Sequence, residues 1–162
     1  MAYSLRALLG HLDTLEAVSQ QNQFAVVIPL EQDIGMIPIT EALHESLEGR
    51  DPVSIWQPLM LAGLSQSILN YALAASSGGR IAYVEAEYFS GEGYQAAVVW
   101  QDEKEIMGPF LAYKLPIRDK PINRVLRLLG VQINDAMDEF DTLGLGACRR
   151  TDDWISQLSN DS

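Results

Sequence analysis

Two glutamates, Glu85 and Glu87, are the residues whose type and spacing come closest to a catalytic arrangement. They alternate with small and apolar residues in AYVEAEYF (82–89), the pattern of a β-strand. Residues two apart on a strand share a face and lie about 7 Å from each other, a separation that hydrolases use for paired carboxyl groups. The two glutamates would nevertheless be neighbours on one strand rather than flank a bond, and no nearby His, Lys or Cys completes a mechanism. We therefore favour an acidic strand face that meets solvent or a partner, and we predict no catalytic residue.

The next segment, GEGYQA (91–96), has the Gly-x-Gly-x-x-Ala spacing of a dinucleotide-binding loop. Such a loop must open a helix, because the helix N-terminus holds the pyrophosphate. Here the loop runs into YQAAVVWQ (94–101), whose β-branched and aromatic residues are typical of a strand. We interpret Gly91 and Gly93 as part of a hairpin turn and predict no cofactor.

The strand alternation also predicts which residues share a face. Tyr83, Glu85 and Glu87 lie on one face of the strand, and the small apolar residues between them lie on the other. We expect the small apolar face to lie under a buried helix at about 57–76, and the Tyr/Glu face to look outward or into a cleft. The candidate partner- or ligand-binding residues are Tyr83, Glu85, Glu87, Glu92, Tyr94 and Gln95.

Few other side chains suggest chemistry. His11 and His44 lie in predicted helices without a second ligand three or four residues away, so we predict no metal site. Cys148 precedes Arg149 and Arg150, which would lower the pKa of its thiol, but it lacks a base and we assign it a structural role.

The elements that position these residues follow from periodicity and capping. Leucines three and four apart, from Leu5 to Leu15, predict an amphipathic helix at the N-terminus, and residues 24–39 read as a hairpin. Further helices are predicted from start and stop signals: one from a Thr40 cap to Gly49, one at about 57–76, one from Pro121 to Gly130, a short one that breaks at Gly144, and one capped by Thr151.

Three runs with short links predict neighbouring antiparallel strands at 80–89, 94–101 and 105–114. The chain of 162 residues has no repeat or linker, and 48% of its residues are hydrophobic, enough for a real core. We therefore predict one α+β domain over 1–162, with an antiparallel sheet of about five strands covered by helices.

The net charge limits which classes of partner this chain is expected to bind. Eleven Lys and Arg residues stand against 22 Asp and Glu, which gives a net charge of −11. Residues 1–55 hold two basic and eight acidic side chains, whereas residues 111–162 hold seven and eight. An acidic surface repels phosphate backbones, so we expect no nucleic-acid partner. The excess favours either a basic protein partner or simple solubility.

Location is inferred from three features. The most apolar stretch, residues 58–75, is interrupted by Ser, Gln and Asn and suits a buried helix better than a membrane span. The N-terminal residues lack the apolar run and cleavage site of a signal peptide, and a lone cysteine forms no internal disulfide. We expect no membrane partner and a cytoplasmic location.

Three segments, AYVEAEYFSGEGYQAAVVW (82–100), INRVLRLLGV (122–131) and DEFDTLGLGACRRTDDW (138–154), together resemble a group of small bacterial proteins. That group shares a Tyr-Phe-Gly-Gly-x-Gly-x-Gln stretch and an acidic, Leu-Gly-rich C-terminal motif; this chain has Ser90 where the group often has Gly. The resemblance implies a single compact domain. The group has no established activity, so the resemblance transfers no functional residue.

Three hypotheses follow. The first is a non-enzymatic protein-binding module, immunity- or antitoxin-like, that uses its acidic strand face against a basic partner. The second is a small hydrolase or ligand-binding enzyme that uses Glu85 and Glu87, with a cleft around Tyr83. The third is a structural homo-oligomer that pairs through the edge strand EIMGPF (105–110).

Overall fold

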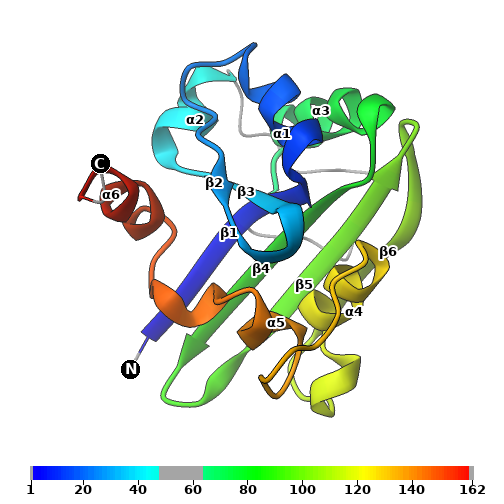
Figure 1. Cartoon of the computed structure of the whole chain (residues 1–162), viewed down its shortest axis with the longest axis vertical. Coiled ribbons are helices and arrows are strands. Elements are labelled where there is room, and N and C mark those ends of the chain that lie inside the picture. The colour runs from blue at the N-terminus through cyan, green and yellow to red at the C-terminus, as the bar shows by residue number, and fades with distance from the viewer. Residues whose placement is uncertain (1, 48–63, 161–162) are drawn as a thin grey trace.

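The structure, a computed structural model, describes residues 2–47 and 64–160. Within them the chain forms an antiparallel sheet of six strands in the order β2-β3-β1-β4-β5-β6 (Figure 1). The strands are β1 (Ala2–His11), β2 (Ile28–Pro29), β3 (Ile34–Pro38), β4 (Ile81–Phe89), β5 (Glu92–Gln101) and β6 (Lys104–Ala112). The predicted α+β class and antiparallel sheet are confirmed, with six strands where about five were expected.

The N-terminal segment is a strand over most of the length for which a helix was predicted. β1 runs through Leu5, Leu8 and Leu9 and pairs with both β3 and β4, and only α1 (Leu12–Ser19) is helical. Leu5 and Leu9 pack on one side of the sheet and Leu8 on the other. A central strand buried on both faces carries apolar residues at nearly every position, and this mimics a helical spacing.

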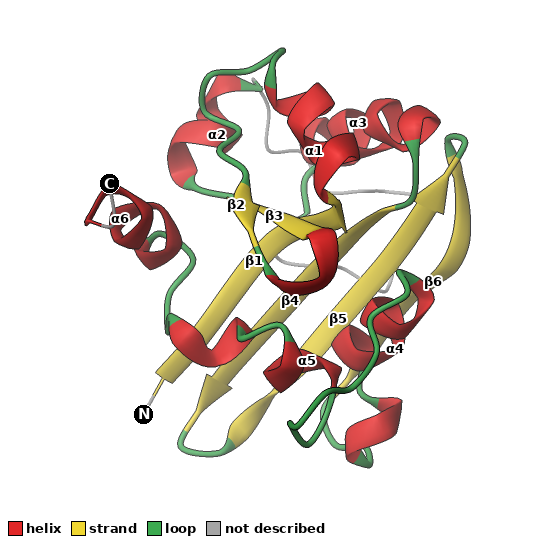
Figure 2. Ribbon diagram, viewed as in Figure 1, coloured by secondary structure: helices red, strands yellow, loops and turns green. Residues whose placement is uncertain are grey.

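Helices cover both faces of the sheet (Figure 2). α1, α2 (Glu41–Ser46) and α3 (Gln66–Ala75) pack with Tyr83, Val98 and Trp100 in one apolar cluster. α4 (Pro121–Leu128) and the segment that includes α5 (Glu139–Thr142) pack on the opposite face. The last helix, α6 (Asp153–Asn160), contacts β2 at the edge of the sheet.

The placement of α3 corrects one prediction. α3 lies on the face of β4 that carries Tyr83, not on the small apolar face of Ala82 and Val84. α4 occupies that small apolar face instead, since short side chains let a helix approach the sheet closely. The part of the predicted 57–76 helix before residue 64, and the predicted stop at Gly49, lie outside the described residues.

Several local signals are confirmed. Thr40 caps α2, because its hydroxyl oxygen accepts the N–H of Leu43 at 3.2 Å. Pro121 begins α4, and Gly144, in the left-handed region at φ 73°, follows α5. Thr151, in contrast, does not cap α6: its hydroxyl accepts the N–H of Arg6 at 3.0 Å and donates to the carbonyl of Ser4. This hydroxyl therefore joins the C-terminal segment to the part of β1 before Ala7, which does not pair with β3.

Both predicted hairpins are present. β2 pairs with β3 in the 24–39 region, over only two residues of β2. β4 and β5 pair from Ile81 and Trp100 to Phe89 and Glu92, and Ser90 and Gly91 form the turn with φ of 53° and 81°. Positive φ at both central residues is the hairpin turn that matches the twist of the strands. Across the described ranges, no helix is long and apolar enough to cross a membrane.

Candidate functional site

Glu85 lies at the centre of a buried polar cluster on β4 and β5. Its side chain is fully buried, as is that of Tyr83. The Tyr83 hydroxyl donates to Glu85 Oε1 at 2.5 Å, and the Tyr94 hydroxyl donates to Glu85 Oε2. The prediction that this face looks outward is therefore wrong for these two residues: Tyr83 packs in the apolar cluster with α3, and Glu85 accepts two phenol hydroxyls. The alternative, that the face lines a cleft, stays a prediction.

Glu87 occupies the next position on the same face, at the margin of this cluster. Its Oε1 accepts the Ser4 hydroxyl at 2.7 Å and lies 3.5 Å from Nη2 of Arg6. Register explains the contact, because Ser4 and Arg6 of β1 stand opposite Glu87 and Glu85 of β4. Sequence reasoning missed Ser4 and Arg6 because it placed them on a helix; a period-two pattern through Ser4, Arg6 and Leu8 is the signal that would have found them.

The two tyrosines of the cluster are hydrogen-bond donors to Glu85. Burial, followed by the neighbouring Glu85 carboxylate, raises the pKa of Tyr83 well above its ordinary value. Burial and the hydrogen bond to Glu85 likewise raise the pKa of Tyr94. A phenol with a raised pKa stays protonated at neutral pH, so both hydroxyls remain donors to Glu85. The cluster is suited to hold Glu85 and Tyr94 in place rather than to transfer protons.

The raised pKa values of Tyr83 and Tyr94 predict that the protein becomes less stable to unfolding at alkaline pH. Because both folded-state pKa values lie above the unfolded value near 10, their stabilisation is complete below about pH 10 and is lost as the pH rises through the folded values. We expect the free energy of unfolding, measured by urea denaturation, to fall above about pH 10. In Tyr83→Phe the fall should be shallower, whereas Tyr113→Phe, which alters an exposed ring, should leave it as in the wild type. Equal slopes in Tyr83→Phe and the wild type would contradict the assignment.

Beyond the buried cluster, the same face ends in a partly exposed surface at the hairpin turn. We call it the hairpin-end patch, and it consists of Glu87, Phe89, Glu92, Tyr94 and Tyr113. Phe89 and Tyr113 are 70% and 68% exposed, which is unusual for large aromatic rings. Phe89 stands opposite Glu92 across the turn, and the ring centroids of Tyr94 and Tyr113 are 5.9 Å apart.

The predicted site residues thus divide between the two faces of the sheet. Tyr83, Glu85, Glu87 and Tyr94 are brought together, and Glu92 lies beside them at the turn. Gln95 points to the opposite face, where its Oε1 accepts the N–H of Ile122 at the start of α4, at 3.1 Å. Gln95 therefore belongs to a different environment from the other candidates.

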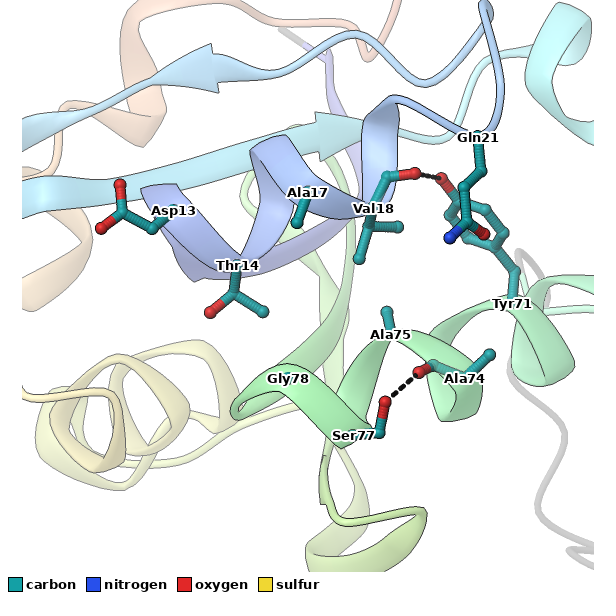
Figure 3. Close-up of a pocket in the computed structure, with 10 residues that line it drawn as sticks. All are labelled: Asp13, Thr14, Ala17, Val18, Gln21, Tyr71, Ala74, Ala75, Ser77 and Gly78. Atoms are coloured by element: carbon teal, nitrogen blue, oxygen red, sulfur yellow. Dashed lines mark hydrogen bonds between the residues drawn. The ribbon is translucent and has the colours of Figure 1, made fainter.

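A hollow between α1 and α3 offers little chemistry (Figure 3). It has a volume of about 380 Å³ and is walled in part by small residues such as Ala17, Ala74 and Gly78. The hydroxyl of Tyr71 already donates to the carbonyl of Val18 at 3.2 Å, and Asp13 is the one acid among those lining residues that the structure describes. A lone carboxylate beside small apolar side chains does not define an active site.

The remaining chemical candidates are structural. The Cys148 thiol is buried and donates to Gln157 Oε1 at 2.9 Å, and burial raises its pKa, with Asp153 adding to the effect. The prediction that Arg149 and Arg150 lower this pKa is wrong, because desolvation dominates. Among the described residues, no group of three or more His, Cys, Asp or Glu could hold a metal ion.

The charged pairs near α4 are also structural. Arg127 Nε lies 3.0 Å from Oε1 of the buried Glu139. Arg124 places its guanidinium 4.1 Å from the ring centroid of Phe110, a cation–π contact with β6.

Comparison of the chain with protein-family models, curated proteins and solved structures finds no match.

Proposed function

We propose that this protein is a non-enzymatic binding module, immunity- or antitoxin-like, that captures a basic protein partner through the hairpin-end patch. The observation that carries the proposal is the joint exposure of Phe89 and Tyr113 beside the carboxylates of Glu87 and Glu92. Exposed aromatic rings are the residues that most often anchor protein interfaces. We further propose that it acts in the cytoplasm.

The patch suits a cationic surface. Carboxylates attract Lys and Arg over a distance and speed encounter, and aromatic faces bind the same cations at contact. The chain as a whole carries a net charge of −11, which adds to the attraction. Arg6 partly neutralises Glu87. We therefore expect the main contacts with the partner to come from Glu92 and the two exposed rings.

The buried cluster gives the patch its rigidity. Tyr94 belongs to both, since its hydroxyl bonds to Glu85 while its ring contacts Tyr113. A side chain that is already fixed loses less conformational entropy on binding. This assigns Tyr83 and Glu85 a positioning role behind the interface.

The proposal is tested with a pull-down from cells of the source organism, using the full chain as bait. We expect recovery of a polypeptide with a net positive charge, released by raising the salt concentration. The double variant Phe89→Ser/Glu92→Lys should reduce recovery by about ten-fold or more, because it removes an anchor ring and reverses a charge. Both residues are exposed, so the variant should fold.

A control variant reverses two charges elsewhere on the surface, one more than the patch variant reverses. Asp13→Lys/Glu16→Lys changes two exposed acids on α1, outside the patch, and should retain the partner. Equal loss in both double variants would mean that net charge alone drives capture. Recovery of the same basic partner by Phe89→Ser/Glu92→Lys would refute the patch as the binding surface.

The two alternatives make separate predictions. A hydrolase built on Glu85 is favoured by the burial of that carboxylate, but both tyrosines that contact it act as donors to it. A homo-oligomer is favoured by the position of β6 at the sheet edge, although Pro109 removes a backbone donor from that strand. Light scattering at several concentrations tests the homo-oligomer directly.

A further inference from the structure

A second hollow lies on the opposite face of the β4–β5 hairpin from the hairpin-end patch. It has a volume of about 330 Å³. This is at the small end of the roughly 300–1,000 Å³ that ligand pockets span. Four parts of the chain meet around it: Tyr3 of β1, Tyr88 and Gln95 of the hairpin, Lys120 before α4, and residues 138–146. Residues of YFSGEGYQ (88–95) and of DEFDTLGLG (138–146) therefore line one hollow.

The apolar walls of this hollow are held in place. The rings of Tyr3 and Phe140 meet edge to face, with centroids 5.8 Å apart. The Tyr3 hydroxyl donates to the carbonyl of Leu145 at 2.8 Å, and Gln95 is fixed by its bond to Ile122. Tyr88 supplies a further aromatic ring. Such walls suit an apolar or planar side chain of a ligand.

Charged side chains of both signs line the hollow, and they do not pair with each other. Lys120 and Asp141 both line it, yet no ion pair joins them. Both carboxylate oxygens of Asp138, in contrast, already accept hydrogen bonds within the protein. One accepts the backbone N–H of Asp141 at 2.8 Å, and the other accepts the side-chain amide of Asn123 at 3.0 Å. One ammonium and one carboxylate thus remain available at the same hollow.

We propose that this hollow binds a small zwitterion, a free α-amino acid with an apolar side chain. Its carboxylate would pair with Lys120, its ammonium with Asp141, and its side chain would pack on Tyr3, Tyr88 and Phe140. A ligand of a single charge would meet a like charge on one side, whereas a zwitterion meets an opposite charge on both. The site lies on the face opposite the hairpin-end patch, so it stands independently of the proposed binding function.

The test is an NMR titration of the full chain with L-phenylalanine at millimolar concentrations. We expect saturable chemical-shift changes at Gln95, Phe140 and Gly146. N-acetyl-L-phenylalanine lacks the ammonium and L-phenylalaninamide lacks the carboxylate, and each should bind about ten-fold more weakly or not at all.

Variants separate the two charges. Lys120→Met should weaken L-phenylalanine binding without changing the affinity for L-phenylalaninamide, and Asp141→Asn should do the same with respect to the N-acetyl derivative. Lys114→Met and Asp135→Asn alter exposed charges outside the hollow and should bind as the wild type. Unsaturable shifts, equal affinity for the three compounds, or wild-type affinity in both Lys120→Met and Asp141→Asn would overturn the proposal.

Discussion

Replacing Glu85 by alanine is expected to lower the free energy of unfolding by about 3 kcal/mol or more. The substitution removes the acceptor of the Tyr83 and Tyr94 hydroxyls and leaves the buried Tyr83 hydroxyl without the partner it now has. A hydrogen bond to a charged group contributes about 1.5–3 kcal/mol, and an unpaired buried polar group costs a similar amount. Urea denaturation at neutral pH measures the loss, which should also lower Tm by roughly 6–12 °C.

Two further variants calibrate this loss. Glu85→Gln keeps the shape of the side chain but offers one acceptor oxygen in place of two. Its free energy of unfolding should therefore lie between that of the wild type and that of Glu85→Ala. Glu92→Ala removes an exposed glutamate from the same hairpin and should change stability by less than about 0.5 kcal/mol. If Glu85→Ala were as stable as Glu92→Ala, the buried cluster would not hold the hairpin in place.

Gly93→Ala is expected to have an even larger effect and to prevent the β4–β5 hairpin from forming in its present register. A Cβ at this position would overlap the backbone carbonyl oxygen of Glu87 and lie 2.8 Å from the Cα of Tyr88. Backbone atoms of a paired strand cannot move aside without breaking the ladder, so the cost should exceed about 4 kcal/mol. Urea denaturation and circular dichroism of the purified variant report it.

The neighbouring glycine provides the control. A Cβ at Gly91 meets nothing within 4 Å, and its only cost is the left-handed backbone at φ 81°. Gly91→Ala should therefore lose about 1–2 kcal/mol, and Gly91→Asn less, since asparagine tolerates that conformation. A Gly93→Ala variant no less stable than Gly91→Ala would show that the close approach at Gly93 is not required.

The hairpin was predictable because two independent signals agreed there. Period-two alternation through Tyr83, Glu85 and Glu87 and the glycine-rich segment after them both indicated strand–turn–strand, and the structure confirms the hairpin. Gly91 lies in the turn as predicted, whereas Gly93 lies in β5 opposite Tyr88 and is required there for close approach of the two backbones. The N-terminal segment was not predictable in the same way, because Leu5, Leu8 and Leu9 fill two cores from one central strand. A single sequence does not distinguish that burial from the stripe of an amphipathic helix.

The environment of the carboxylates depended on long-range pairing that periodicity does not reveal. Which face of β4 receives α3 and which receives α4 is decided by packing across the whole sheet. The contact of Ser4 and Arg6 with Glu87 joins residues more than 80 positions apart. Face sharing by Tyr83, Glu85 and Glu87 was therefore predictable, whereas the burial of Glu85 and the neutralisation of Glu87 were not.

A charge-reversal test of the whole acidic strand face predicted from the sequence would include Glu85. The structure removes that residue from any such test, because a lysine at a fully buried position would unfold the protein and lose any partner for a trivial reason. Phe89 and Glu92 take its place, since both are exposed at the turn. The proposed binding face is thus reduced from the whole acidic strand to its end at the hairpin turn.

Site-specific photo-crosslinking can show whether a basic polypeptide binds at the hairpin-end patch. A photoreactive phenylalanine analogue is placed at position 89 in the hairpin-end patch and, as a control, at exposed position 74 on α3, and both proteins are irradiated in cells of the source organism. We expect an adduct with one basic polypeptide from position 89 that is absent from position 74. Equal adducts from both positions, an adduct only with a second copy of this chain, or no adduct from position 89 would contradict it.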